Sequence, residues 1–228
     1  MIGRRLFLKR AMVLSAGFLT LSKGMKAWAK GLPSDPGGVS GGASSSNMIA
    51  LPPFEKSSSF PLAKALLERK SSRSYDASRI LTQEEISRLL WATAGMNRTD
   101  GRRTIASANA RYPVDVMVAM PGGVFRYEPG DHKLVKVISD DIRPVVPVQA
   151  GFKNTAMIVL YVINRDKVPR GRIEYADIEI GSMGQSLYLE AAALGIGSCF
   201  FASINYDTTI KVLGIKENQI LRIAQAVG

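Results

Sequence analysis

The chain has 228 residues, with 46% hydrophobic and 21% charged residues, which is an ordinary globular composition. This length favours one domain with a core of its own. A single cysteine, Cys199, excludes an intramolecular disulfide, and with a single histidine, His132, no zinc site of the usual kind is expected. His132 lies in a turn-forming segment, 128–133, and is expected to be a solvated turn residue rather than part of a catalytic triad.

The formal net charge of +11 is concentrated at the N-terminus. Six of the eleven excess positive charges lie in residues 1–29, which contain no acidic residue, so the rest of the chain has an excess of only five. No long basic run interleaved with aromatic residues follows. A nucleic-acid partner is therefore not expected.

Residues 1–29 have the three parts of an export signal. The segment Gly3-Arg4-Arg5-Leu6-Phe7-Leu8-Lys9 resembles a twin-arginine motif, residues 11–21 are apolar but too short to span a bilayer, and Ala27-Trp28-Ala29 matches a cleavage site. We expect a twin-arginine signal peptide and export to the periplasm in the folded state, a route suited to a protein with a non-covalent cofactor. The alternatives are an ordinary export signal and an uncleaved anchor.

The mature chain is expected to begin with a flexible linker over residues 30–48, which are rich in glycine, serine and proline. Residues 49–228 then form one domain. Helical spacing of apolar residues predicts a helix over 61–70. Thr82 and Glu85 form a capping box that predicts the start of a second helix, which ends at Gly95.

Strands are predicted over 114–120, 124–127 and 134–138, and the apolar run 157–163 predicts a central strand. The longest predicted helix, 175–194, is apolar on most sides and is expected to be buried in the domain or against a second subunit. Two more strands, over 197–204 and 220–227, flank a short helix that Asp207 caps and Gly214 ends. This mixture without a strict βαβ alternation predicts an α+β fold.

Two clusters of residues suggest ligand binding. Segment 69–75 combines guanidinium groups and serine hydroxyls that suit a phosphate, and residues 69, 71 and 73 would point the same way in an extended chain. Segment 103–113 has small residues that a flat ligand could approach, and Asn109 offers both a donor and an acceptor to a heterocycle. The alternatives are a solvated basic helix end for the first cluster and a surface loop for the second. No glycine-rich dinucleotide motif or P-loop is present.

Taken in order, these clusters and their surroundings resemble the nitroreductase superfamily, whose members bind FMN. The matching segments extend over residues 49–228: Arg69 to Tyr75, Leu89-Leu90-Trp91-Ala92-Thr93-Ala94-Gly95, Arg103 to Pro113, Glu179-Ile180-Gly181, Gln185 to Leu189, Ala193 to Ser198, 212–215 and 226–228. Within the superfamily the sequence is most similar to the dehydrogenase branch that includes the azoline-oxidising enzymes of thiazole and oxazole peptide synthesis.

The resemblance implies an α+β homodimer, with a mixed sheet flanked by helices and a long buried helix at the interface, that binds one FMN in each of two interface sites. By position, it assigns the FMN phosphate and ribityl chain to Arg69, Ser71 and Arg73, with Lys70 contributing backbone or charge. It places Asn109 beside the pyrimidine edge of the flavin, and Ala202 and Ser203 near N5. Gln185 occupies a position that the family often fills with an amide.

The resemblance also implies an oxidoreductase that transfers hydride or electrons through flavin N5 to or from a small organic substrate. No side chain stands out as a catalytic acid or base. Because free NAD(P)H is not expected in the periplasm, a membrane or periplasmic electron-transfer partner is expected. Many relatives continue past the last strand with basic residues, so here we expect phosphate binding to depend more on Arg69 and Arg73. The alternative function is a flavin-binding protein without turnover.

Overall fold

A seven-stranded antiparallel sheet organises residues 47–56 and 59–228, which are the residues that the computed structural model describes. Its strand order is β1–β4–β3–β2–β5–β7–β6, and every neighbouring pair is antiparallel. The strands are β1 (Met48–Ala50), β2 (Val114–Met120), β3 (Gly123–Glu128), β4 (Lys133–Ile138), β5 (Met157–Asn164), β6 (Ser198–Phe201) and β7 (Gln219–Val227). The predicted α+β class is confirmed, whereas β1 was not predicted.

Strand β5 lies in the interior of the sheet, as its apolar sequence predicted. It pairs with β2 on one side and with β7 on the other, and its residues 157–163 are all buried. The buried polar side chains of Tyr161, on β5, and Gln225, on β7, have partners within the core. The Tyr161 hydroxyl donates to Oε1 of Gln225 (2.8 Å). Nε2 of Gln225 donates to Oγ of Ser198 (3.0 Å) and to the Gly184 carbonyl (3.2 Å). These bonds offset the cost of burying an amide and a phenol.

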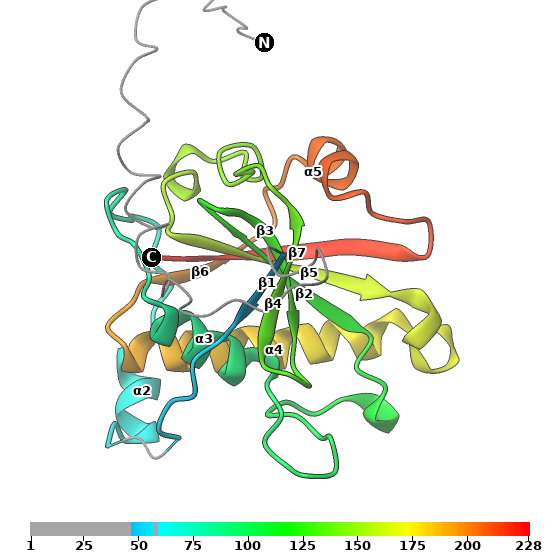
Figure 1. Ribbon diagram of the computed structural model, residues 1–228, viewed down its shortest axis with the longest axis horizontal. Coiled ribbons are helices and arrows are strands. Elements are labelled where there is room, and N and C mark those ends of the chain that lie inside the picture. The colour runs from blue at the N-terminus through cyan, green and yellow to red at the C-terminus, as the bar shows by residue number, and fades with distance from the viewer. Residues whose placement is uncertain (1–46, 57–58) are drawn as a thin grey trace, which may run out of the picture. The chain divides into compact units, whose positions relative to one another are not determined.

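Helices cover both faces of the sheet (Figure 1). On one face α4 (Ile173–Ala193) runs along the strands with α3 (Gln83–Ala94) and α2 (Leu62–Glu68) near it, and on the other lie α5 (Tyr206–Leu213) and the segment between β4 and β5. Among the described residues, no helix is both long and apolar enough to cross a membrane.

Helix ends confirm most of the predicted caps. Thr82 and Glu85 form the capping box of α3, and Gly214 ends α5 in the left-handed conformation (φ 61°). The prediction that Asp207 caps α5 is wrong, because the N-cap position belongs to Asn205. The Asn205 amide instead donates to the Val145 carbonyl (2.7 Å), and Asp207 lies in the first helical turn, where the helix dipole still favours a carboxylate.

Helix α4 packs closely on β6 because Gly184 has no side chain. A Cβ atom built at Gly184 would lie 1.8 Å from the Phe200 ring. One turn further along, the Tyr188 hydroxyl accepts a hydrogen bond from the Phe200 backbone N–H (2.7 Å). The C-terminal half of α4 is therefore held at a fixed distance from the edge strand that leads into the candidate site.

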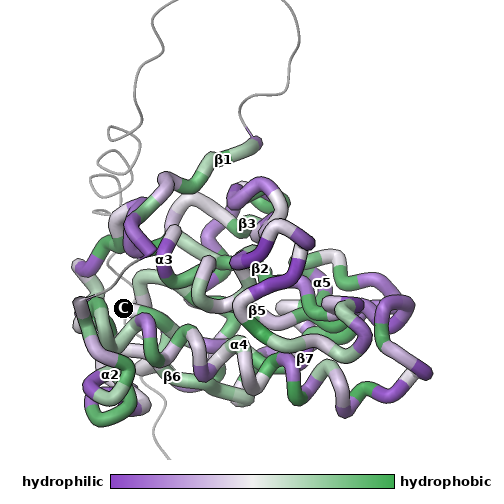
Figure 2. Tube along the Cα trace, turned by 90° about the horizontal axis from the view of Figure 1, so that it is seen from below, coloured by the Kyte–Doolittle hydropathy of each residue, from purple (hydrophilic) through white to green (hydrophobic). Residues whose placement is uncertain are grey.

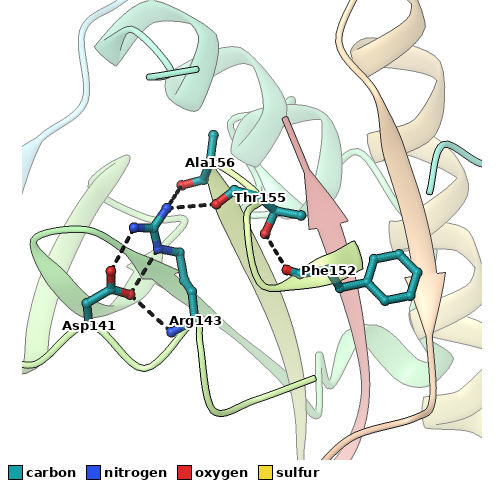
Figure 3. Close-up of polar contacts among 5 residues, drawn as sticks. All are labelled: Asp141, Arg143, Phe152, Thr155 and Ala156. Atoms are coloured by element: carbon teal, nitrogen blue, oxygen red, sulfur yellow. Dashed lines mark hydrogen bonds and ion pairs between the residues drawn. The ribbon is translucent and has the colours of Figure 1, made fainter. Parts of the chain in front are cut away.

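The segment between β4 and β5 is fixed by Arg143 (Figure 3). Its guanidinium binds both carboxylate oxygens of Asp141 (2.9 and 2.7 Å) and donates to the carbonyls of Thr155 (2.7 Å) and Ala156 (3.1 Å). In the same segment, Phe152 stacks on Phe201 of β6, with 4.6 Å between ring centroids. These contacts hold the segment against the sheet at the start of β5.

The predicted signal peptide, residues 1–29, lies outside the described residues, as does the predicted linker except for Asn47 and Met48, of which Met48 belongs to β1.

Candidate functional site

The basic segment 69–75 runs extended beside β6, directly after α2 ends at Glu68. Ser71 pairs with Ser198 in a parallel bridge, and the Ser72 N–H donates to the Ser198 carbonyl (2.9 Å). The Tyr75 hydroxyl donates back to the Ser72 carbonyl (2.6 Å). The segment therefore has the extended backbone on which its predicted phosphate-binding role depends.

A cavity of about 670 Å³ opens beside this segment, which is large enough for a cofactor of FMN size. Its floor is formed where Gly197 and Gly228 exchange backbone hydrogen bonds of 3.0 Å in each direction. A Cβ atom at Gly197 would lie 2.8 Å from the Gly228 carbonyl oxygen, so a side chain there would displace the floor. The cavity is lined by Leu67, Glu68, Lys70, Ser72, Ser74, Tyr188, Ala192, Gly195, Ile196, Gly197, Ser198 and Gly228.

Tyr188 of α4 contacts the basic segment through Arg69 and Ser71, which alternate with the residues that line the cavity. The Arg69 guanidinium lies 5.3 Å from the centroid of the Tyr188 ring, and the Ser71 and Tyr188 hydroxyl oxygens are 3.2 Å apart. Arg69 and Ser71 thus meet at Tyr188, while Lys70, Ser72 and Ser74 line the cavity. The sequence analysis assigned Tyr188 no role at the site, although a tyrosine within a buried helix requires a partner for its hydroxyl.

The cations of this segment have no counterion within the described part of the chain. Arg69, Lys70 and Arg73 form no salt bridge there, and the nearest acid in sequence, Glu68, pairs with Lys64 (3.7 Å). Three cationic side chains next to serine hydroxyls, without a carboxylate to neutralise them, fit a bound dianion such as a phosphate. These donor types suit a phosphate such as that of FMN, and of the three cations only Lys70 lines the cavity itself, together with Ser72, Ser74 and Glu68.

Asn109 lies in a loop with an unusual backbone. Asn109, Ala110 and Tyr112 all have positive φ angles, of 54°, 51° and 46°, where residues other than glycine are rarely found. Each such residue costs on the order of 1 kcal/mol, so the surrounding structure must impose this shape. One restraint is the Tyr112 N–H, which donates to Oγ of Ser107 (2.9 Å). Another is the Arg103 guanidinium, which stacks on the Tyr112 ring at 4.3 Å.

Glu179 of α4 lies beside Ser107, at the start of this loop, and its side chain is buried (1% exposed). Neither of its carboxylate oxygens has a hydrogen-bond partner of ordinary geometry within the described residues. Burial raises the pKa of Glu179 from 4.5 to about 7, although the Ser107 hydroxyl, the Arg103 charge and the Val114 N–H favour its ionised form. In the sequence analysis Glu179 belongs to a segment that matches the family but has no assigned role, although an acid within an apolar helix was a further signal.

The predicted site residues fall into separate regions of the described chain. Arg69 and Ser71 contact Tyr188, whereas Asn109 belongs to the loop beside Glu179, nine residues earlier on α4, or about 14 Å along the helix. Ala202 and Ser203 follow β6, where the Ser203 carbonyl accepts from the Val148 N–H (2.8 Å). Among the predicted residues, the side chains of Arg73, Ala202 and Gln185 are exposed.

The prediction of a solvated His132 is wrong. Its Nδ1 lies 2.8 Å from the Tyr127 hydroxyl, and its Nε2 lies 2.7 Å from Oγ of Ser87. Since Ser87 also donates to the Pro52 carbonyl (2.7 Å), Nε2 carries the proton that binds Ser87 and Nδ1 accepts from Tyr127. The histidine therefore links the turn between β3 and β4 to α3 and has a structural role.

Glu179 should make the stability of the protein depend on pH. The folded protein retains a proton that the unfolded chain releases above pH 4.5, so the free energy of unfolding falls as the pH rises from about 4.5 to about 7. Relative to Glu179→Gln, which does not titrate, the wild type should lose on the order of 3 kcal/mol over this range in urea unfolding. The control Glu174→Gln, an exposed position on the same helix, should follow the wild type. Identical pH slopes for the wild type and Glu179→Gln would disprove this role.

Comparisons with known proteins agree with this fold. The family model described as the nitroreductase family matches residues 66–228. A candidate nitroreductase of Methanocaldococcus jannaschii is 31% identical over 188 residues, which cover 76% of this chain and 92% of that protein.

Solved structures extend the comparison. A candidate nitroreductase of Ralstonia eutropha is 28% identical, with a TM-score of 0.72 and coverage of 86% of this chain and 98% of its own. A candidate nitroreductase of Desulfovibrio desulfuricans, solved in complex with FMN, has the same fold, with a TM-score of 0.56 and 18% identity over 74% of this chain and 85% of its own. On the family match and the identity to the M. jannaschii protein, the chain belongs to the nitroreductase family.

Proposed function

We propose that the protein is an FMN-dependent oxidoreductase that transfers hydride or electrons to or from a small organic substrate. The observation that carries the proposal is the basic segment 69–75, whose three cations lack counterions in the described chain and which borders a cavity of about 670 Å³. Membership of the nitroreductase family supports an oxidoreductase, and the FMN complex of the D. desulfuricans protein supports the choice of cofactor.

In this proposal the chain holds the cofactor mainly through its phosphate. Arg69, Ser71 and Arg73 bind the phosphate and ribityl chain, and Lys70 adds positive charge from the cavity side. Tyr188 orients Arg69 and Ser71 through its ring and its hydroxyl. When bound, the flavin supplies the redox chemistry at N5, and the protein supplies orientation and electrostatics.

We further propose a homodimer that completes the flavin site. Several apolar side chains of α2 are exposed, among them Leu67 at 86%, and Ile178 of α4 is 68% exposed; Figure 2 shows hydrophobic segments on α2 at the periphery of the fold. A second copy would bury these side chains, which isolated monomers rarely expose together. It would also provide a route for Asn109 of one copy to approach a flavin held by Arg69 of the other. Ala202 and Ser203 are proposed to lie near N5.

The cellular setting is also a proposal. The twin-arginine motif supports export of a folded, flavin-loaded protein to the periplasm, where a membrane or periplasmic partner would exchange electrons with the flavin. The resemblance of the sequence to the azoline-oxidising branch supports a dehydrogenation of a heterocycle or thiol-bearing substrate. The substrate class is best tested by a screen of donors and acceptors that follows reduction and reoxidation of the flavin.

Reversal of the charge at Arg73 should abolish FMN retention. In Arg73→Glu a carboxylate faces the phosphate, so the purified full-length variant should be colourless, whereas the wild type carries the flavin absorption band. The control Arg170→Glu reverses an exposed arginine outside the site and should remain yellow. Equal flavin occupancy in Arg73→Glu and the wild type would exclude the phosphate assignment. A yellow wild type whose flavin no donor and acceptor can reduce and reoxidise would favour a binding protein without turnover.

Replacement of the paired arginines should block export. The double variant Arg4→Lys, Arg5→Lys keeps the charge of the segment and removes the guanidinium pair that defines the twin-arginine motif. Cell fractionation should find the variant inside the cytoplasm and the wild type in the periplasm. The control Lys23→Arg, outside the motif, should be exported normally. Periplasmic accumulation of the double variant at the wild-type level would argue against this export route.

A further inference from the structure

The loop that carries Asn109 is strained, and its first residue, Ser107, lies next to a buried acid, Glu179. Three of its residues have left-handed backbone angles, and the buried carboxylate oxygens of Glu179, beside Ser107, have no hydrogen bond of ordinary geometry in the described chain. Both features are unfavourable in the closed loop. Each would be relieved if the loop opened, because the backbone could relax and water could solvate the carboxylate.

The contacts between loop and acid explain how the closed form is held. The Ser107 hydroxyl oxygen accepts from the Tyr112 N–H, which leaves the hydroxyl proton to turn toward Glu179. At the ends of the loop, Thr104 donates to carbonyls at the end of α3 (3.1 and 3.2 Å), and β2 begins at Val114. The anchored ends confine any movement to residues 107–112.

From this arrangement we infer that Glu179 is a proton-sensitive lock on the 107–112 loop, closed when the carboxyl is protonated and released when it is ionised. The inference rests on the proposed function in one respect: the loop presents Asn109 to the flavin, so the lock controls access to one part of the flavin site. Glu179 acts through the loop and is a positioning residue.

The direction follows from proton linkage. The closed loop keeps the carboxyl in a buried environment where its pKa is about 7, whereas an open loop exposes it to water and returns the pKa toward 4.5. Opening therefore releases a proton and becomes more favourable as the pH rises between these two values. Above about pH 7 the carboxyl is ionised in both forms, and the dependence ends.

Other charged groups face this cluster and must be separated from Glu179. Arg103 is the charged side chain that acts directly on Glu179, and it remains positive throughout this pH range. Asp115 of β2 faces Arg103, and burial raises its pKa although Lys167 lies 3.8 Å away. Asp115→Asn is therefore the control for a second buried carboxyl.

Amide hydrogen exchange on the full-length, FMN-free protein tests the lock without relying on activity. In the wild type, the protection of amides 107–112, corrected for the intrinsic pH dependence of exchange, should fall by up to about tenfold per pH unit between pH 5 and 7 and then level off. Glu179→Gln, which mimics the protonated acid, should keep high protection at every pH. Asp115→Asn and Glu174→Gln should retain the wild-type profile, and residues 70–75 serve as an internal control without this dependence.

Addition of saturating FMN tests the link to the flavin site. It should slow exchange at 107–112 in the wild type at pH 7, where the free loop is most open. The same pH dependence of amide protection at 107–112 in the wild type and in Glu179→Gln would overturn the lock. If the variant does not fold, a wild-type protection that does not change with pH would overturn it. Unchanged loop exchange in a protein that binds FMN would overturn its connection to the flavin. A protein that binds no FMN would refute the proposed function, while the FMN-free profiles would still decide on the lock.

Discussion

The hydroxyl of Tyr188 holds together the parts from which the candidate site is built. It accepts from the Phe200 N–H of β6 and lies within hydrogen-bond distance of Ser71, while the ring of the same residue supports the Arg69 guanidinium. One side chain of α4 thus connects the long helix, the edge strand and the basic segment. The absence of a side chain at Gly184 makes this contact possible, because it lets the Phe200 ring lie directly against the helix. Without this packing, segment 69–75 would lose the surface along which it extends.

Much of the fold could be predicted from local patterns. The capping box of Thr82 and Glu85, the apolar run of β5 and the glycine that ends α5 all act within a few residues, so the sequence alone indicates them. The errors arose where distant segments decide. Asn205 takes the cap position of α5 while its amide binds Val145, and His132 is held by Tyr127 and by Ser87, 45 residues away. Strand β1 is too short to show a periodic pattern.

For the candidate site, the sequence suggested a kind of ligand but not the arrangement of the side chains. Arginines and serines over 69–75 are residue types that suit a phosphate ligand, with a solvated basic helix end as the alternative, and the structure leaves these cations without counterions in the described chain. Sequence could not show that Tyr188 supports them or that Glu179 lies buried beside the Asn109 loop, because both depend on how α4 packs. The two regions are separated along α4, which is the physical reason to propose that two copies of the chain build each flavin site.

The central claim is that FMN is held in a site completed by a second copy. Sedimentation velocity, followed at both the protein and the flavin absorption bands over a range of concentrations, tests it most directly. The account predicts that the flavin signal sediments only with the dimer, at one FMN per chain, and that dilution to monomer releases the flavin. Flavin that stays bound to a sedimenting monomer, or a dimer that carries no flavin, would contradict it.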